Sequence, residues 1–150
     1  MLELQPTENE IVVPMTVKRG LSAQEWLDSM GRKLNVDPNA ISSLPLNAGG
    51  PEKAEFVWIK VGRNIGDEQV DKILAEHGLV RDLGMQLQYN AEHPWFAQTH
   101  PNGYSWKNNK GEWCVLSFND SKSGEARVQV RSDYGTGWNS DTWIGGRRAE

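Results

Sequence analysis

Residues 104–131 read YSWKNNKGEWCVLSFNDSKSGEARVQVR, and this stretch decides the predicted fold. Apolar and polar residues alternate along it with the period of two that is typical of half-buried strands. Two segments rich in Asn, Gly, Ser and Asp, at 108–111 and 119–124, interrupt the alternation and indicate turns. The stretch therefore predicts a three-stranded antiparallel meander with one buried and one solvent-facing side. Its strands are expected at 104–106, 112–118 and 126–131.

The segment before the meander carries both helix and strand signals. Ser22 and Glu25 have the spacing of a capping box at the start of a helix, and Gly78 is a natural C-terminal cap. Pro14 predicts an edge position or a bulge for the first strand, because proline cannot donate to a β-ladder. In chain order, the expected strands are 11–17, 56–61 and 84–89, and the expected helices are 22–34, 37–44 and about 64–77.

The order of these elements favours an α+β fold. We expect a mixed, mainly antiparallel sheet with two or three helices packed on one face and the meander at the C-terminal end. The 150 residues fit a single domain, which divides into a helix-containing part at 1–90 and an aromatic-rich part at 91–150. Residues 45–55 read as a linker within that domain and not as a domain boundary.

Composition and charge disfavour several functional classes. The net charge is −4, and residues 91–150 hold seven basic against seven acidic residues, so nucleic acid is not an expected partner. No apolar run approaches the roughly 20 residues of a membrane span, and no signal peptide is recognised at the start. A single cysteine, Cys114, fits a reducing compartment. We therefore expect a cytoplasmic protein.

The last stretch, residues 132–150, places large aromatic side chains among Gly, Ser, Asp, Asn and Thr, which do not build a core. One explanation is that these aromatics fold over an open end of the sheet and cap the core. The other is that they form a binding patch, because Trp, Tyr and Arg are enriched at interface hot spots. On the second explanation, the predicted binding residues are Tyr134, Trp138, Trp143, Arg127 and Arg131. Earlier in the chain, Trp95 and Phe96 are expected to hold their loop against the core.

A catalytic alternative uses the stretch from Glu92 to His100. His93 or His100 could act as a general acid or base, with Glu92 orienting one of them. Their spacing of seven residues differs from the helical and strand spacings that commonly present paired metal ligands, so we expect no metal. Cys114 lies on the predicted core face, which favours a structural cysteine over a nucleophile.

No cofactor is expected either, because residues 62–66 (GRNIG) match neither the dinucleotide-binding nor the Walker pattern. The sequence thus favours a non-enzymatic binding protein, a small intracellular accessory or inhibitor-type domain. Its expected partner is a protein or a second copy of the chain. Small chains without catalytic motifs are typical of such proteins, including phage-encoded ones. The remaining alternative is a carbohydrate-binding module that stacks sugar rings on Tyr134, Trp138 and Trp143, with Asp141 bonding hydroxyls.

Overall fold

The computed structural model describes residues 9–30, 34–44, 50–118, 126–130 and 137–148. The strands in these residues are β1 (Glu10–Thr16), β2 (Leu34–Val36), β3 (Lys53–Lys60), β4 (Leu79–Val80), β5 (Asn102–Lys107), β6 (Trp113–Phe118), β7 (Ala126–Val130) and β8 (Trp143–Arg148). The helices are α1 (Ala23–Ser29), α2 (Pro38–Ile41), α3 (Val70–Glu76), α4 (Leu83–Glu92) and α5 (Phe96–Thr99), and a short 3-10 turn, η1 (Asp67–Gln69), precedes α3.

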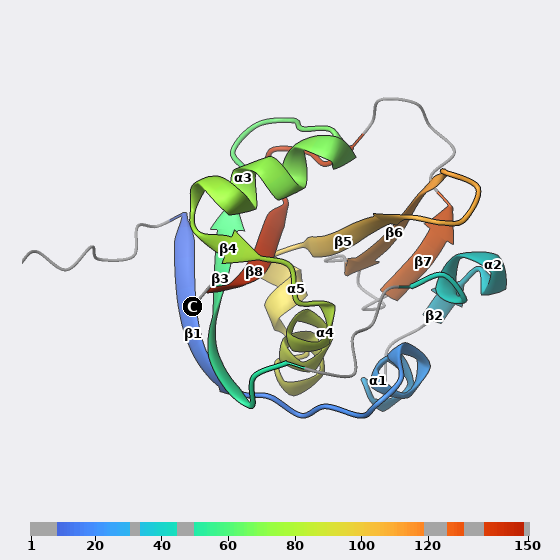
Figure 1. Ribbon diagram of the computed structural model, residues 1–150, viewed down its shortest axis with the longest axis horizontal. Helices are drawn as coiled ribbons and strands as arrows, with labels where there is room; N and C mark the ends of the chain where they lie inside the picture. Colours follow the sequence, from blue (N-terminus) through green and yellow to red (C-terminus); the bar gives the residue numbers. More distant parts are fainter. Residues whose placement is uncertain (1–8, 31–33, 45–49, 119–125, 131–136, 149–150) are drawn as a thin grey trace, which may run out of the picture.

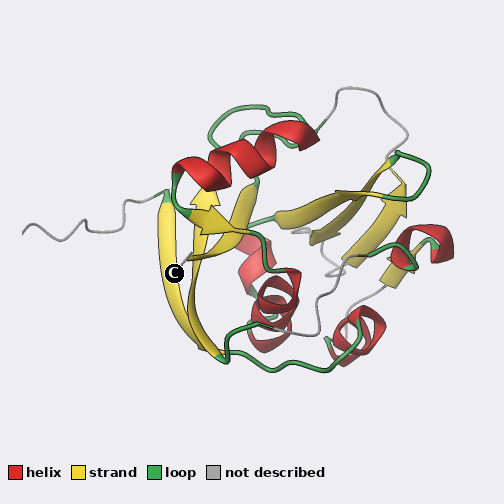
Figure 2. Ribbon diagram, in the orientation of Figure 1, coloured by secondary structure: helices red, strands yellow, loops and turns green. Residues whose placement is uncertain are grey.

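The eight described strands, yellow in Figure 2, belong by their hydrogen bonding to one mixed sheet. Its order is β1-β3-β8-β5-β6-β7-β2, and the short β4 pairs with β8 beside this path. The pairs are antiparallel except for β2 with β7 and β5 with β8. The α+β class, the mainly antiparallel sheet and the pairing of the predicted meander β5-β6-β7 are therefore confirmed. The expected solvent-facing side of the meander is wrong at Ser105 and Val115, which are buried. β1 lies at the edge of the sheet, in agreement with the prediction from Pro14.

The sheet has two parts that meet at a narrow junction. β5 and β8 are joined by one parallel residue pair, Asn102 with Trp143, while β4 covers the other end of the same edge of β8. Figure 1 shows β1, β3, β4 and β8 on one side and β5, β6, β7 and β2 on the other, with α4 and α5 drawn between them.

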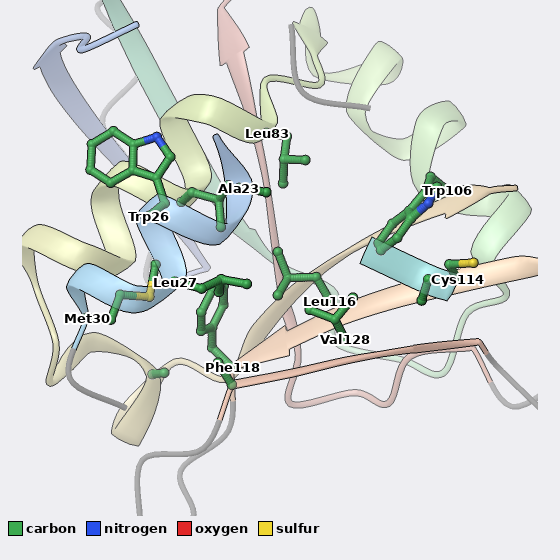
Figure 3. Close-up of a cluster of buried hydrophobic side chains, with 14 residues drawn as sticks. Ala23, Trp26, Leu27, Met30, Leu83, Trp106, Cys114, Leu116, Phe118 and Val128 are labelled. Carbon is green, nitrogen blue, oxygen red and sulfur yellow. The ribbon is translucent and has the colours of Figure 1, made fainter. Parts of the chain in front are cut away.

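Helices cover both faces of the sheet, whereas the sequence predicted helices on one face. The alternation of β3 explains this arrangement, because Val57 and Ile59 belong to a buried cluster with residues of α3. Phe56 and Trp58 belong to a different cluster, which includes Met85 of α4. A third cluster joins α1 and α4 to the meander, as Figure 3 shows for the side chains that converge there.

The segment 84–89 is helical, so the predicted strand there is wrong. Asp82 caps α4, because its carboxylate accepts a hydrogen bond from the Met85 backbone N–H at 3.1 Å. The strand was predicted because Met85, Leu87 and Tyr89 alternate with two glutamines, but both glutamines are buried. Gln86 donates to the Gly103 carbonyl oxygen and Gln88 to the Thr16 carbonyl oxygen. These bonds tie α4 to both parts of the sheet.

The C-terminal stretch contains β8, a strand that the sequence analysis did not predict. β8 lies inside the sheet between β3 and β5, and Ile144 packs in the cluster beneath α3. Gly145 is required there, because an added Cβ would lie 2.3 Å from Cε2 of Phe56. A further correction concerns α1, which ends at Ser29, while Leu34 begins a strand instead of closing the helix.

Candidate functional site

The residues predicted to form a binding patch do not gather on one exposed surface within the described parts of the chain. Trp138 and Trp143 are buried, with 8% and 5% of their surface exposed. Trp138 packs between β6 and the residues before α3, and Trp143 packs against the aromatics of β3. Arg127 lies half-buried on β7. Tyr134 and Arg131 lie outside the described residues.

These positions agree with the capping explanation for the two tryptophans. Trp138 forms a β-bridge with Ile65, in which each backbone N–H donates to the other residue's carbonyl oxygen at 2.7 and 2.9 Å. Trp143 starts β8, and its backbone N–H donates to the Pro101 carbonyl oxygen at 2.8 Å. Neither indole offers a free face of the size that a docking anchor needs.

One tryptophan does lie on the surface. Trp95 is 73% exposed, whereas Trp113 is half-buried and the other five tryptophans are buried. Trp95 stands at the N-terminal end of α5, directly after Pro94. The Gln98 N–H donates to its carbonyl oxygen at 3.2 Å, and the Phe96 N–H donates to the His93 carbonyl oxygen at 3.0 Å. The backbone that carries the exposed indole is thus held by a hydrogen-bonded turn.

The next residue, Phe96, fixes this turn to the core. Its ring lies 4.9 Å from the ring of Trp58 and 4.8 Å from that of Tyr89. The imidazole of His100 stacks on the Phe96 ring, with ring centroids 4.4 Å apart and planes 4° apart, and it also contacts Trp143 at 4.8 Å. The sequence expectation that Trp95 and Phe96 both hold the loop is correct for Phe96 and wrong for Trp95.

The two histidines and Glu92 do not form a catalytic constellation. Glu92 accepts a hydrogen bond from Gln88 at 3.2 Å and pairs with Lys18 at 3.8 Å, and within the described residues it bonds to neither histidine. His93 contacts the ring of Tyr89 at 4.3 Å. Nδ1 of His100 lies 2.6 Å from the Thr99 hydroxyl. Desolvation lowers the pKa of His100 below its ordinary value, while hydrogen bonding to the Phe96 backbone raises this pKa and the nearby charge of Lys60 lowers it.

Cys114 is fully buried, in agreement with the expectation of a structural cysteine. It belongs to the cluster between α1 and the meander, with Leu116 and Phe118 (Figure 3). Burial raises the pKa of its thiol above the ordinary value, which disfavours the reactive thiolate. No group of three or more His, Cys, Asp or Glu side chains in the described residues is placed to hold a metal ion.

A largely buried cluster of charged side chains centres on Asp82. Asp82 accepts two hydrogen bonds from the Arg19 guanidinium, each 3.1 Å long, and one from Nε of Arg147 at 3.2 Å. All three side chains are largely buried. This cluster ties the chain before α1 to the start of α4 and to β8, and its hydrogen bonds occupy the Asp82 carboxylate.

Comparison with known proteins assigns no function to the chain, so a functional assignment rests on the residues described above. The chain matches no protein-family model, no curated protein and no solved structure. Among the helices that the structure describes, none combines the length and the apolar character needed to cross a membrane.

Proposed function

We propose that this chain is a non-enzymatic binding protein that docks a protein partner through a surface centred on Trp95. The observation that carries the proposal is the 73% exposure of this side chain, in a chain whose other tryptophans are buried or half-buried. A partner that covers this ring would remove its apolar surface from water, which is favourable. Tryptophan is also the residue type most enriched at interface hot spots.

The support beneath Trp95 favours docking with little rearrangement. Phe96 packs against Trp58 and Tyr89, and His100 stacks on the Phe96 ring. A side chain on a turn held in this way loses less conformational freedom on binding than one on a mobile loop. The exposed side chains of His93 and Gln98 lie close in sequence and supply polar groups for a rim around the indole.

The proposed protein is of the accessory or inhibitor type that the sequence favoured. Its binding surface is centred on Trp95 instead of Trp138 and Trp143. The carbohydrate alternative loses support, because two members of its stacking platform, Trp138 and Trp143, are buried. The enzyme alternative loses support because Glu92 is held by Gln88 and Lys18. A cytoplasmic location belongs to the proposal and rests on the single cysteine.

Affinity capture followed by reconstitution tests the proposal. The wild type, Trp95→Ala and Val80→Ala are each immobilised and exposed to lysate of the source cells. Val80 is a matched control, because it is an apolar side chain 40% exposed on β4. We expect one protein to be retained in stoichiometric amount by the wild type and Val80→Ala and lost by Trp95→Ala, and to form the same complex when purified. Equal retention by all three folded proteins would contradict the proposal.

A further inference from the structure

β1 is the long free edge of the sheet. It has seven residues and pairs with β3 along one side, while no described strand lies on its other side (Figure 1). The edge at the opposite end of the sheet, β2, has only three residues. A long edge strand presents unpaired backbone groups to any other extended chain, so such strands commonly carry features that prevent pairing. Two features of this kind lie along β1.

The hydrogen bonds that flank β1 show which of its backbone groups face away from β3. The Lys60 N–H donates to the Asn9 carbonyl oxygen at 2.9 Å, and the Val17 N–H donates to the Glu52 carbonyl oxygen at 2.7 Å. In the antiparallel register between these two bonds, every second residue of β1 bonds to β3. The backbone groups of the residues in between therefore point to the free side of the strand. These residues are Glu10, Val12, Pro14 and Thr16.

Pro14 occupies one of these outward positions. It lies opposite Glu55 in a pair that makes no ladder hydrogen bond, so the missing N–H costs β1 no bond to β3. On the free side, the same absence removes a donor that an added strand would need, and the pyrrolidine ring fills the space of that donor. The Pro14 side chain is exposed, so the core does not require a proline at this position.

A side chain of α4 covers the C-terminal end of the same edge. Nε2 of Gln88 donates to the Thr16 carbonyl oxygen at 2.8 Å, and Oε1 of Gln88 accepts from the Lys18 backbone N–H at 2.8 Å. Both backbone groups lie on the side away from β3, where one residue of a neighbouring strand would bond to them. The Gln88 carboxamide therefore takes the place of such a strand at this end of β1.

Pro14 and Gln88 together leave little of the edge open. In the described part of the chain, only Glu10 and Val12 keep both an N–H and a carbonyl oxygen available on the free side. The apolar run in this region, residues 11–13, consists of β-branched side chains without charge. Segments of this composition pair with their own copies unless a proline or a charge interrupts them.

We propose that Pro14 prevents two copies of this chain from pairing through their β1 strands. A second copy fits this edge once the proline is replaced, because an antiparallel pairing that places position 14 of one copy opposite Val12 of the other is two-fold symmetric. Each copy then donates one N–H at position 14 to the Val12 carbonyl oxygen of the other copy. The proline removes both of these hydrogen bonds. The inference does not depend on docking through Trp95.

The molar mass in solution tests the proposal. Pro14→Val and Pro14→Thr both supply the N–H and introduce residues that favour strands, and threonine does so with a polar side chain. Size-exclusion chromatography with light scattering compares both variants with the wild type over a series of concentrations. We expect each variant to form a species of about twice the wild-type mass as the concentration rises, as symmetric pairing implies.

Pro38→Ala is the matched control. Pro38 is also exposed, and as the first residue of α2 it needs no N–H for the helix. Its replacement should leave the molar mass unchanged. Equal masses of both Pro14 variants and the wild type at every concentration would overturn the proposal. Association of the valine variant alone, or an equal increase in the control, would also overturn it, because neither result can come from the N–H at position 14.

Amide hydrogen exchange followed by NMR locates the association. In the wild type, the Val12 N–H points to the free side and should exchange faster than those of Ile11 and Val13, which bond to β3. In Pro14→Val, exchange at Val12 should become about tenfold slower once about nine-tenths of the protein is paired, because only the unpaired form exchanges. Association that adds no protection at Val12 would place the contact elsewhere and contradict the proposal.

Discussion

Gly103 of β5 faces the indole of Trp138, and a Cβ added to this glycine would lie 2.3 Å from Cη2 of the tryptophan. The absence of a side chain on β5 therefore makes the room that Trp138 fills. The two hydrogen bonds between Trp138 and Ile65 hold the tryptophan backbone over this position. An aromatic residue that seemed available for binding is thus part of the packing that closes one face of the sheet.

The tryptophans should separate into core and surface residues in stability measurements. We expect Trp138→Ala and Trp143→Ala each to lower the free energy of unfolding by about 3–5 kcal/mol, because each removes a buried indole. Trp95→Ala should change it by less than about 0.5 kcal/mol. Urea unfolding followed by circular dichroism measures all three. A small effect at Trp143 would show that this residue does not support the core.

Gly103→Ala should lower the free energy of unfolding by at least about 1–3 kcal/mol, because the methyl group would meet both the Trp138 ring and the Leu116 carbonyl oxygen. Gly66→Ala is the matched control. The groups nearest to an added Cβ there belong to the end of the Glu68 side chain, which can move aside. The same urea experiment compares the two, and equal stability of both variants would contradict the packing described for Gly103.

Asp82→Asn should be strongly destabilising. The substitution removes the negative charge that serves both Arg19 and Arg147, and it leaves two largely buried guanidinium groups without their counterion. Loss of one partner of a buried ion pair costs about 3–5 kcal/mol. The control is Glu55→Gln, whose partner Arg148 is exposed, and it should cost less than about 1 kcal/mol. Chemical denaturation at neutral pH that ranks the two variants in the reverse order would refute the structural role of Asp82.

Stability should depend on pH through His100. Desolvation lowers its pKa in the folded protein below the ordinary 6.5, so folding favours the neutral imidazole. This contribution is fully present above pH 6.5 and is lost as the pH falls through the lower folded-state value. We therefore expect His100→Asn to reduce the slope of stability against pH in the acidic range. The midpoints of urea unfolding of the wild type and His100→Asn, measured across that pH range, provide the comparison. Identical slopes of stability against pH in the two proteins would argue against a lowered pKa of His100.

The parts of the fold that could be predicted are those in which local pattern and tertiary environment agree. The strand at 56–61 is a short run of β-branched and aromatic residues, the meander shows a period of two, and the cap at Gly78 has the positive φ of 70° that glycine favours. α4 was missed because its polar residues are buried and satisfied by distant partners, such as the Thr16 and Gly103 carbonyl oxygens. The alternation of apolar and polar residues along the sequence does not reveal such partners.

The same limit applies to β8 and to the candidate surface. β8 contains Gly145 and Gly146, and its strand identity depends on the bulky aromatics of β3 that occupy the space beside Gly145. For the surface, a local signal was present: Trp95 and Phe96 are adjacent at the start of a helical turn, where neighbouring side chains point in different directions. Only one of these two side chains can point into the core. The packing of Phe96 against Trp58 shows that it is Phe96.

The most direct test of the central claim is the dissociation constant of the purified protein–partner complex, measured by isothermal titration calorimetry for the wild type, Trp95→Ala and Val80→Ala. A hot-spot residue contributes at least about 2 kcal/mol on truncation, which corresponds to roughly thirtyfold in affinity. The account predicts a loss of that size or more for Trp95→Ala, with unchanged affinity for Val80→Ala. Equal affinities for all three proteins would contradict docking through Trp95.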